Sequence, residues 1–386
     1  MKKLLILLIL STLFIFPESQ VKAEELKLAE SAKSAILIEA STGKVLFEKN
    51  ADEKLVPASM TKMMSMLLII ENIENGVLKW DQKITVSENA SSMGGSQILL
   101  ETGEKMTVED LFKGVAIASG NDAVVALGEA IAGTEDNFVS MMNKRAKELG
   151  LKNTNFKTPH GLDAPNHYSS ARDMSIIAKE LVKHEKVLTF TSVYEDYLRE
   201  NTDKKIWLVN TNKLVRFYDG VDGLKTGYTK EAGYCLTATA KKDGMRIIAV
   251  VMGEPDSKTR NKEVSEMLDY SFAQYKIDNL LTGSSSLGKY EVDKGSQKYV
   301  TVVPKGDVTV LRKKGEKSGN ATYDVKLNNL KAPIKKGETV GQLKIKEDGK
   351  VIRTIDLTVE KDIKKANLGE LFLRYMKDIF TGDITI

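Results

Sequence analysis

The order of alternating and helical segments is the feature that most constrains the fold of this chain. Residues 34–50 alternate apolar and polar side chains around 41–44, a pattern that predicts a β-hairpin. Residues 233–253 alternate in the same way on both sides of 242–244, which predicts two further strands. Helical spacing prevails between these regions. The sequence therefore predicts one α/β domain whose sheet gathers strands from both ends of the segment.

Four segments carry the helical pattern. Residues 59–73 are rich in Met, Leu and Ile, and the methionines are expected to fill the core around this helix. Residues 107–133 predict a helix, a break at 119–121 and a second apolar helix. Residues 170–184 are amphipathic, and a last helix is predicted over 261–275, after the final strands.

The first 23 residues predict an export signal. Lys2 and Lys3 precede an apolar run over 4–16, and residues 21–23 form a small-residue cleavage site. The run is too short to span a bilayer comfortably, and no other segment is apolar enough to do so. We therefore expect an exported mature chain from Glu24, with its first domain over 24–275.

The composition changes after about Tyr275, where short alternating runs are separated by Gly, Pro and Lys. These runs are residues 299–313, 321–330, 338–346 and 350–360. They predict a small antiparallel β-sandwich over 276–366. This segment holds twenty Lys and Arg against twelve Asp and Glu, which favours an anionic wall polymer or lipid headgroups as partner. A solvated lysine-rich surface explains the excess equally well, and no nucleic acid is expected outside the cell.

Residues 367–386 form a different kind of segment. Apolar residues recur there at three- and four-residue spacing and make one continuous stripe along a helix. They are Leu368, Leu371, Phe372, Tyr375, Met376, Ile379 and Phe380. The preceding β domain should have its own core, so the stripe needs another surface. A peripheral membrane anchor is favoured over docking on the protein itself, with the helix in the headgroup layer.

Ser59 and Lys62 stand three positions apart where a helix is predicted to begin. That spacing places both side chains on one face, and the Ser59 N–H lies near the positive end of the helix dipole. The pair is weak on its own, because the same spacing recurs at Ser19 and Ser286. A helix cap beside a solvated lysine explains it as well.

Two further motifs make a functional interpretation of the Ser59–Lys62 pair stronger. Ser119 and Asn121 lie at the break between two helices, where side chains can point into a cleft. Lys225-Thr226-Gly227 opens the predicted strand run, where a glycine lets a ligand approach the sheet edge. Each motif alone is explicable as a cap or turn. Together, in this order, they form a coherent set.

Ser-x-x-Lys, a Ser-x-Asn motif and Lys-Thr-Gly are the signature of penicillin-binding proteins and class A β-lactamases. The chain resembles the low-molecular-weight penicillin-binding proteins, the serine D-alanyl-D-alanine carboxypeptidases of family S11. The resemblance covers the mature chain and includes the stretches at 56–64, 117–133, 155–175 and 221–240. Ser-Gly-Asn replaces the Ser-Asp-Asn of class A enzymes, and the loop over 160–172 lacks their Glu-x-x-x-Asn arrangement. Both departures favour a carboxypeptidase.

The resemblance implies a fold and a division of roles. The fold is a transpeptidase-like domain with an antiparallel sheet flanked by helices, followed by the β domain and the terminal helix. Ser59 would be the nucleophile and Lys62 its base, neutral because burial and the charge of Lys225 depress its pKa. Ser119 would relay the proton to the departing amine. The implied substrate-binding residues are Asn121, Lys225, Thr226, Gly227, Tyr228 and Arg260, although an ordinary surface ion pair also explains Arg260.

The resemblance also implies the partners. Peptidoglycan stem peptides ending in D-Ala-D-Ala would be the substrates, and β-lactams would be covalent inhibitors. No metal or other cofactor is implied, and His160, His167 and His184 show no ligand spacing and are expected in loops or on the surface. Three alternatives stay open: a β-lactamase, a DD-endopeptidase acting on cross-links, and a non-catalytic wall-binding or β-lactam-sensing protein.

Overall fold

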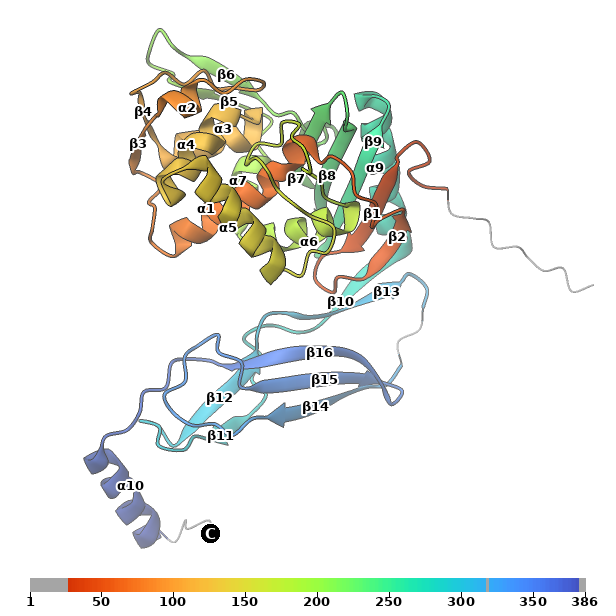
Figure 1. Cartoon of the computed structure of the whole chain (residues 1–386). Coiled ribbons are helices and arrows are strands. Elements are labelled where there is room, and N and C mark those ends of the chain that lie inside the picture. Colours follow the sequence, from red (N-terminus) through yellow and green to blue (C-terminus); the bar gives the residue numbers. More distant parts are fainter. Residues whose placement is uncertain (1–26, 317–318, 382–386) are drawn as a thin grey trace, which may run out of the picture.

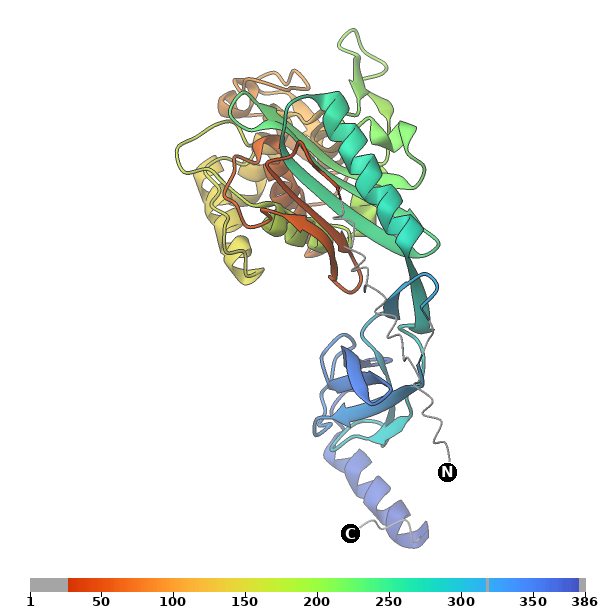
Figure 2. The same cartoon turned by 90° about the vertical axis from the view of Figure 1, so that its right-hand side faces the viewer.

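The computed structural model describes residues 27–316 and 319–381 of the 386-residue chain. The predicted export signal lies outside the described residues. The described chain is elongated, with an α/β domain at one end, a β-rich domain beside it and helix α10 at the far end (Figures 1 and 2). This confirms the predicted fold class.

The main sheet has five strands that pair antiparallel, in the order β2-β1-β9-β8-β7. Its strands are β1 (Ser34–Glu39), β2 (Val45–Lys49), β7 (Val221–Thr229), β8 (Gly233–Lys242) and β9 (Met245–Glu254). The predicted hairpin and the predicted pair of strands are thus both confirmed, and β1 pairs with β9 to join the two ends of the domain. The structure adds strand β7, so Lys225-Thr226-Gly227 lies inside an edge strand rather than at the opening of one.

Helices cover both faces of this sheet. Helix α9 (Ser257–Gln274) packs on one face against β8 and β9 (Figure 2). Helices α1 (Lys62–Glu74) and α6 (Ala171–Leu181) lie on the other face. Helices α3 (Val108–Ala118), α4 (Asn121–Ala132) and α5 (Glu135–Glu148) pack against α1. The break at Ser119–Gly120, between α3 and α4, is where the sequence predicts it.

Smaller elements complete the domain. They are the strand pairs β3 (Lys83–Thr85) with β4 (Lys105–Thr107) and β5 (Glu195–Leu198) with β6 (Ile206–Val209), and the short helices α2 (Glu88–Ser91), α7 (Glu185–Thr191) and α8 (Leu214–Phe217).

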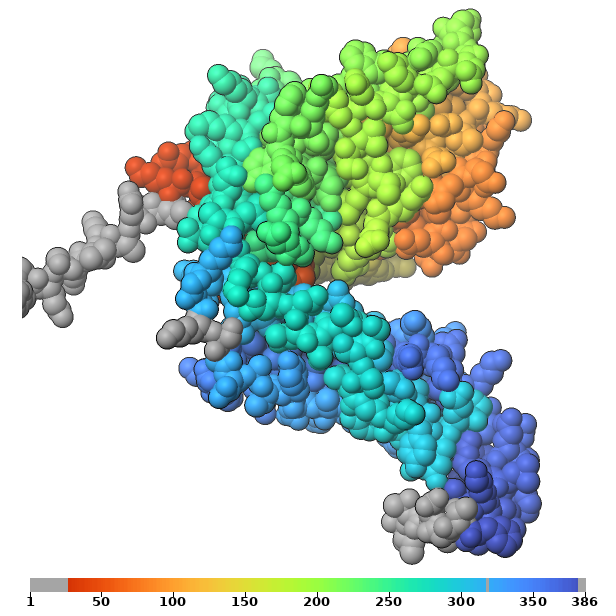
Figure 3. All heavy atoms as spheres, turned by 180° about the vertical axis from the view of Figure 1, so that it is seen from behind, coloured from red at the N-terminus to blue at the C-terminus, as the bar shows by residue number. Residues whose placement is uncertain are grey.

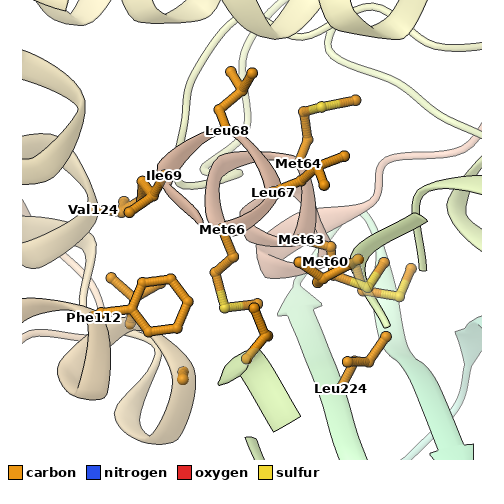
Figure 4. Close-up of a cluster of buried hydrophobic side chains, with 14 of the residues drawn as sticks. Met60, Met63, Met64, Met66, Leu67, Leu68, Ile69, Phe112, Val124 and Leu224 are labelled. Carbon is orange, nitrogen blue, oxygen red and sulfur yellow. The ribbon is translucent and has the colours of Figure 1, made fainter. Parts of the chain in front are cut away.

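Helix α1 forms the centre of the core. Every side chain from Lys62 to Ile70 is buried, and all of them except Lys62 and Ser65 are apolar. In Figure 4, Met66 points toward Phe112 and Met60 and Met63 lie on the side of Leu224, within one hydrophobic core. Their flexible thioethers fill the irregular space between helices and sheet, which fixes the position of the α1 N-terminus.

The β-rich domain has its own core. Its five-stranded sheet runs in the order β11 (Lys289–Glu291), β12 (Tyr299–Pro304), β16 (Lys350–Val359), β15 (Gly341–Glu347) and β14 (Ala321–Leu327). A separate pair, β10 (Tyr275–Leu281) with β13 (Val308–Lys313), leads into it from α9. The two domains touch beside this pair, where Arg353 donates to the Ser41 carbonyl at 3.0 Å and Ser41 Oγ lies 2.8 Å from Thr309 Oγ1 (Figure 3).

Helix α10 (Leu368–Thr381) confirms the predicted terminal helix. Its polar side contacts the β-rich domain, because Asp378 pairs with Lys298 at 2.9 Å and Arg374 donates to the Gly295 carbonyl at 2.6 Å. Apolar side chains remain exposed on the rest of its surface, and these are Leu368, Phe372, Leu373, Tyr375, Ile379 and Phe380. Among the described residues, none of the helices combines the length and the apolar character that crossing a bilayer requires.

Candidate active site

Ser59 and Lys62 form a hydrogen-bonded pair. The chain enters through Pro57 into a single 3-10 turn, Ala58–Thr61, and α1 begins at Lys62. Lys62 Nζ lies 3.0 Å from Ser59 Oγ and donates to the His160 carbonyl at 2.7 Å. The turn therefore presents the serine hydroxyl one turn away from an amine, as the sequence spacing predicts.

Lys62 is held where an ammonium ion is unfavourable. Its side chain is fully buried, and this burial, with the nearby charge of Lys225, lowers the pKa of Lys62 well below its usual value. Asp122 opposes the shift, but its carboxylate is already occupied by the backbone N–H groups of Ile98 and Leu100. A lysine with a lowered pKa can accept a proton from the serine hydroxyl, which a charged lysine cannot do.

Ser119 and Asn121 lie on the second wall of the site. Ser119 ends α3 in the left-handed conformation, with φ of 66°, and Asn121 begins α4. Asn121 Nδ2 donates to the Gly94 carbonyl at 2.7 Å. Ser119 Oγ and Asn121 Oδ1 are buried and have no hydrogen-bond partner among the described residues. Such groups are costly unless a bound molecule satisfies them.

Strand β7 supplies the third wall. Lys225 is 1% exposed and donates to the Thr226 carbonyl at 3.1 Å, and the Thr226 hydroxyl donates to Thr211 Oγ1 at 2.8 Å. Burial, with the charge of Arg260, lowers the pKa of Lys225 to about 7. A Cβ on Gly227 would lie 2.8 Å from the Pro57 carbonyl oxygen and 3.2 Å from Ser59 N. Glycine is therefore required here for β7 to approach the Ser59 turn.

One cavity of about 480 Å³ joins these walls. It is lined by Ser59, Ser119, Thr226, Gly227, Tyr228 and Arg260 among others. Lys62 and Lys225 lie buried behind that lining, and Asn121 lies beside it. Arg260 is only 5% exposed and donates to Asn261 Oδ1, so it is not the surface ion pair that the sequence left open.

Several contributors to the site escaped sequence reasoning. Thr211 and Lys213 line the cavity from the segment before α8, and the His160 main-chain oxygen accepts from Lys62. No residue pattern marks a backbone carbonyl or a lone threonine. His160 and His167 are indeed loop residues, but both are buried, and His167 Nε2 lies 2.8 Å from Thr61 Oγ1. The described residues include no cluster of three or more potential metal ligands from His, Cys, Asp and Glu.

This arrangement suits acyl transfer to a serine. It places the Ser59 hydroxyl beside an amine whose lowered pKa allows it to accept the hydroxyl proton. A second hydroxyl, which has no partner among the described residues, and cationic side chains lie beside the same cavity. Of the nine site residues predicted from the sequence, six line the cavity. Lys62 contacts Ser59 in that lining, and Asn121 and Lys225 are buried beside lining residues in the sequence.

Comparisons with known proteins agree with this chemistry. Residues 19–256 match the family model for D-alanyl-D-alanine carboxypeptidase, and residues 275–365 match that for the penicillin-binding protein 5 C-terminal domain. The chain is 54% identical over 353 residues to the D-alanyl-D-alanine carboxypeptidase DacF of Bacillus subtilis, with 91% of each chain covered. Penicillin-binding protein 5 from Haemophilus influenzae superposes with a TM-score of 0.70 at 34% identity, covering 88% of this chain and 99% of the other. Penicillin-binding protein D2 from Listeria monocytogenes, solved with cefotaxime bound, gives 0.58 at 33% identity, covering 64% and 98%.

Proposed function

This chain belongs to the D-alanyl-D-alanine carboxypeptidases of peptidase family S11, the low-molecular-weight penicillin-binding proteins, and we propose that Ser59 carries its reaction. The activity is removal of the terminal D-alanine from peptidoglycan stem peptides. The observation that carries the assignment is the 3.0 Å contact between Ser59 Oγ and a buried Lys62 at the edge of the cavity.

The residues divide the acylation step between them. Ser59 Oγ attacks the carbonyl carbon of the D-Ala-D-Ala bond while its proton passes to Lys62 Nζ. The backbone N–H groups of Ser59 and Tyr228 stabilise the oxyanion, and the close approach of Gly227 to Ser59 N supports this pairing. Ser119 takes up a proton from Lys62 as it passes its own to the departing amine, so that D-alanine leaves and both residues return to their starting protonation states. Water then releases the shortened peptide from Ser59.

Other residues hold the substrate. The terminal carboxylate binds beside Thr226 and Arg260, with Lys225 behind them, and it raises the pKa of Lys225 when it arrives. Asn121 binds the amide on the acyl side, which would satisfy its unpaired oxygen. A β-lactam carries a similar carboxylate and acyl group, so it acylates Ser59 as a covalent inhibitor.

The proposal extends to location and domain organisation. We divide the chain into an export signal (1–23), a catalytic domain (24–275), a β-rich domain (276–366) and an anchor helix (367–386). The exposed apolar side chains of α10 support a peripheral anchor at the outer face of the cytoplasmic membrane, because the polar side of the helix already contacts the β-rich domain. The β-rich domain then holds the catalytic domain off that surface.

D-alanine release from a peptide ending in D-Ala-D-Ala tests the function. We expect release by the wild-type protein and none by Ser59→Ala. Release from purified cross-linked dimers would add an endopeptidase activity. Absence of release by the folded wild-type protein would refute the assignment and favour a binding or sensing role.

A further inference from the structure

Two buried carboxyl groups lie against each other at the end of the main sheet. Glu254 is the last residue of β9 and is 1% exposed, and Glu263 lies on α9 and is 5% exposed. Their side chains are within hydrogen-bond reach of each other. Ser31 N donates to Glu263 Oε1 at 2.9 Å, but both oxygens of Glu254 and the second oxygen of Glu263 have no donor among the described residues. Two ionised carboxylates buried in this way are unfavourable, so the contact calls for a proton.

One proton shared between the two groups satisfies this arrangement. Burial, together with the hydrogen bond and the charge of Glu263, raises the pKa of Glu254 to about 8. Burial acts on Glu263 in the same direction, but hydrogen bonds from Glu254 and from the Ser31 main chain outweigh it and lower the pKa of Glu263. The proton therefore resides on Glu254 at neutral pH, and Glu254 donates it to Glu263.

Ionisable groups from several elements surround Glu254. Lys49 on β2 lowers the pKa of Glu254 by its charge, and Asp256 at the start of α9 raises it. Tyr234 on β8 pairs with Glu254 across the sheet. The other ionisable groups near this place are Lys33, Lys230, Glu231, Cys235 and Arg260. Among the described residues none of these groups donates to Glu254, so Glu263 is its hydrogen-bond partner.

The pair lies close to a residue of the reaction cavity. Arg260 is on the same face of α9 as Glu263, one helical turn earlier. It lines the cavity, and its guanidinium donates to the neutral amide oxygen of Asn261. Burial lowers the pKa of Arg260, and the charge of an ionised Glu254 is among those that oppose this shift. An ionised Glu254 therefore competes with a substrate carboxylate for Arg260, whereas a neutral Glu254 does not.

We propose that Glu254 and Glu263 are positioning residues that share one proton and thereby keep Arg260 directed at the terminal carboxylate of the substrate. The inference rests on the proposed function, in which Arg260 binds that carboxylate. Neither carboxyl group touches the substrate. When the shared proton is lost to solvent, the ionised Glu254 draws the guanidinium away from the cavity. The expected signature is a KM that rises at alkaline pH while kcat changes less.

Two isosteric substitutions should have opposite effects on hydrolysis of a peptide ending in D-Ala-D-Ala. In Glu254→Gln the amide donates to Glu263 at every pH, so wild-type kcat/KM should fall roughly three- to ten-fold relative to this variant between pH 7 and pH 9. In Glu263→Gln the amide donates to Glu254 and stabilises its ionised form, so KM should already be raised at pH 7. Lys225 titrates in all of these proteins, and its effect cancels in each ratio.

Two controls show that the effect acts through Arg260. Glu266→Gln removes an exposed carboxylate from the same helix, where it pairs with Lys262, and should follow the wild-type pH profile. In an Arg260→Gln background, the profiles with Glu254 and with Glu254→Gln should be parallel. Cooperative thermal unfolding checks that each variant has folded.

Infrared spectroscopy tests the shared proton without measuring activity. Between pH 7 and pH 9 the wild-type protein should lose one carboxylic-acid C=O band that Glu254→Gln lacks. Absence of this band, parallel wild-type and Glu254→Gln profiles with Arg260 intact, or equal effects of the two glutamine variants would overturn the inference alone. Failure of the folded wild-type protein to release D-alanine would overturn the proposed function with it.

Discussion

Lys62 Nζ lies 3.0 Å from Ser59 Oγ, and the backbone places both side chains within one helical turn. Burial of Lys62 lowers the pKa of its amine, and this shift would allow the amine to accept the proton of the Ser59 hydroxyl. The burial is itself a product of the core, since α1 is enclosed by the helices α3 to α6 and the main sheet. A helix start that would otherwise be an ordinary turn thereby holds the serine and the amine that we propose as nucleophile and base.

The lowered pKa of Lys225 predicts a pH-dependent stability. Its pKa is about 7 in the folded protein, against 10.5 as its ordinary value, so the unfolded chain binds more protons between these values. This group therefore makes the free energy of unfolding rise with pH from about 7 towards 10.5. In Lys225→Met we expect that slope to be smaller by about 1 kcal/mol per pH unit. Thermal unfolding of both proteins from pH 7 to 9 measures the difference, and parallel curves would contradict it.

The unpaired hydroxyl of Ser119 predicts a variant that loses rate without losing stability. Ser119→Ala removes a buried group that has no partner among the described residues, so the midpoint of thermal unfolding should stay the same or rise. If the hydroxyl relays the proton to the leaving group, D-alanine release should fall by roughly 10²–10⁴-fold. Near-normal release would remove Ser119 from the mechanism.

The close approach of Gly161 to the Ala58–Thr61 turn predicts that a side chain at position 161 would disturb this turn. The φ of Gly161 is +85°, and a Cβ there would lie 1.9 Å from the Ala58 carbonyl oxygen. We expect Gly161→Ala to cost about 3 kcal/mol or more in unfolding free energy and to impair acylation. Gly150→Ala is the matched control, with φ of +72° and nothing within 4 Å of the added Cβ, and should cost about 1–2 kcal/mol without affecting acylation. Equal costs for both variants would show that the contact is unimportant.

The apolar face of α10 predicts membrane binding. Phe372→Ser/Phe380→Ser removes two exposed aromatic rings, and we expect the protein to shift from the membrane to the soluble fraction, as it should after deletion of residues 367–386. The variant Phe217→Ser, which removes an exposed ring from the catalytic domain, is the control and should stay bound. If the truncated protein stays on the membrane, the anchor assignment fails.

The sequence predicts most accurately those structural elements that are determined by local residue patterns. The hairpin around residues 41–44 and the break at Ser119 follow from alternation and from turn-forming residues, and both occur where they are predicted. Strand β7 is not predicted as a strand of its own, because Asp222 and Gly223 near its start have low β propensity and this part of the strand is held by pairing with β8. Strand β10 was not predicted either, since it is defined by its pairing with β13.

The site residues also divide into those that a local sequence pattern predicts and those that depend on long-range contacts. The three motifs identify the side chains to which we assign the chemistry, and the structure places Ser59, Ser119, Thr226 and Gly227 from them in the lining of one cavity. The Thr226–Thr211 contact and the His160 carbonyl depend on how distant segments meet, which spacing cannot reveal. The burial of His160 and His167 has the same origin, because the loop over 160–170 is held against the Ala58–Thr61 turn through Gly161 and Thr61.

Intact-mass analysis after incubation with penicillin tests the central assignment most directly. We expect the wild-type protein to gain the mass of one penicillin, Ser59→Ala to gain none, and folded Lys62→Met to be acylated at least roughly 10²-fold more slowly. An equal adduct on Ser59→Ala, or normal acylation of Lys62→Met, would contradict the account of the pair.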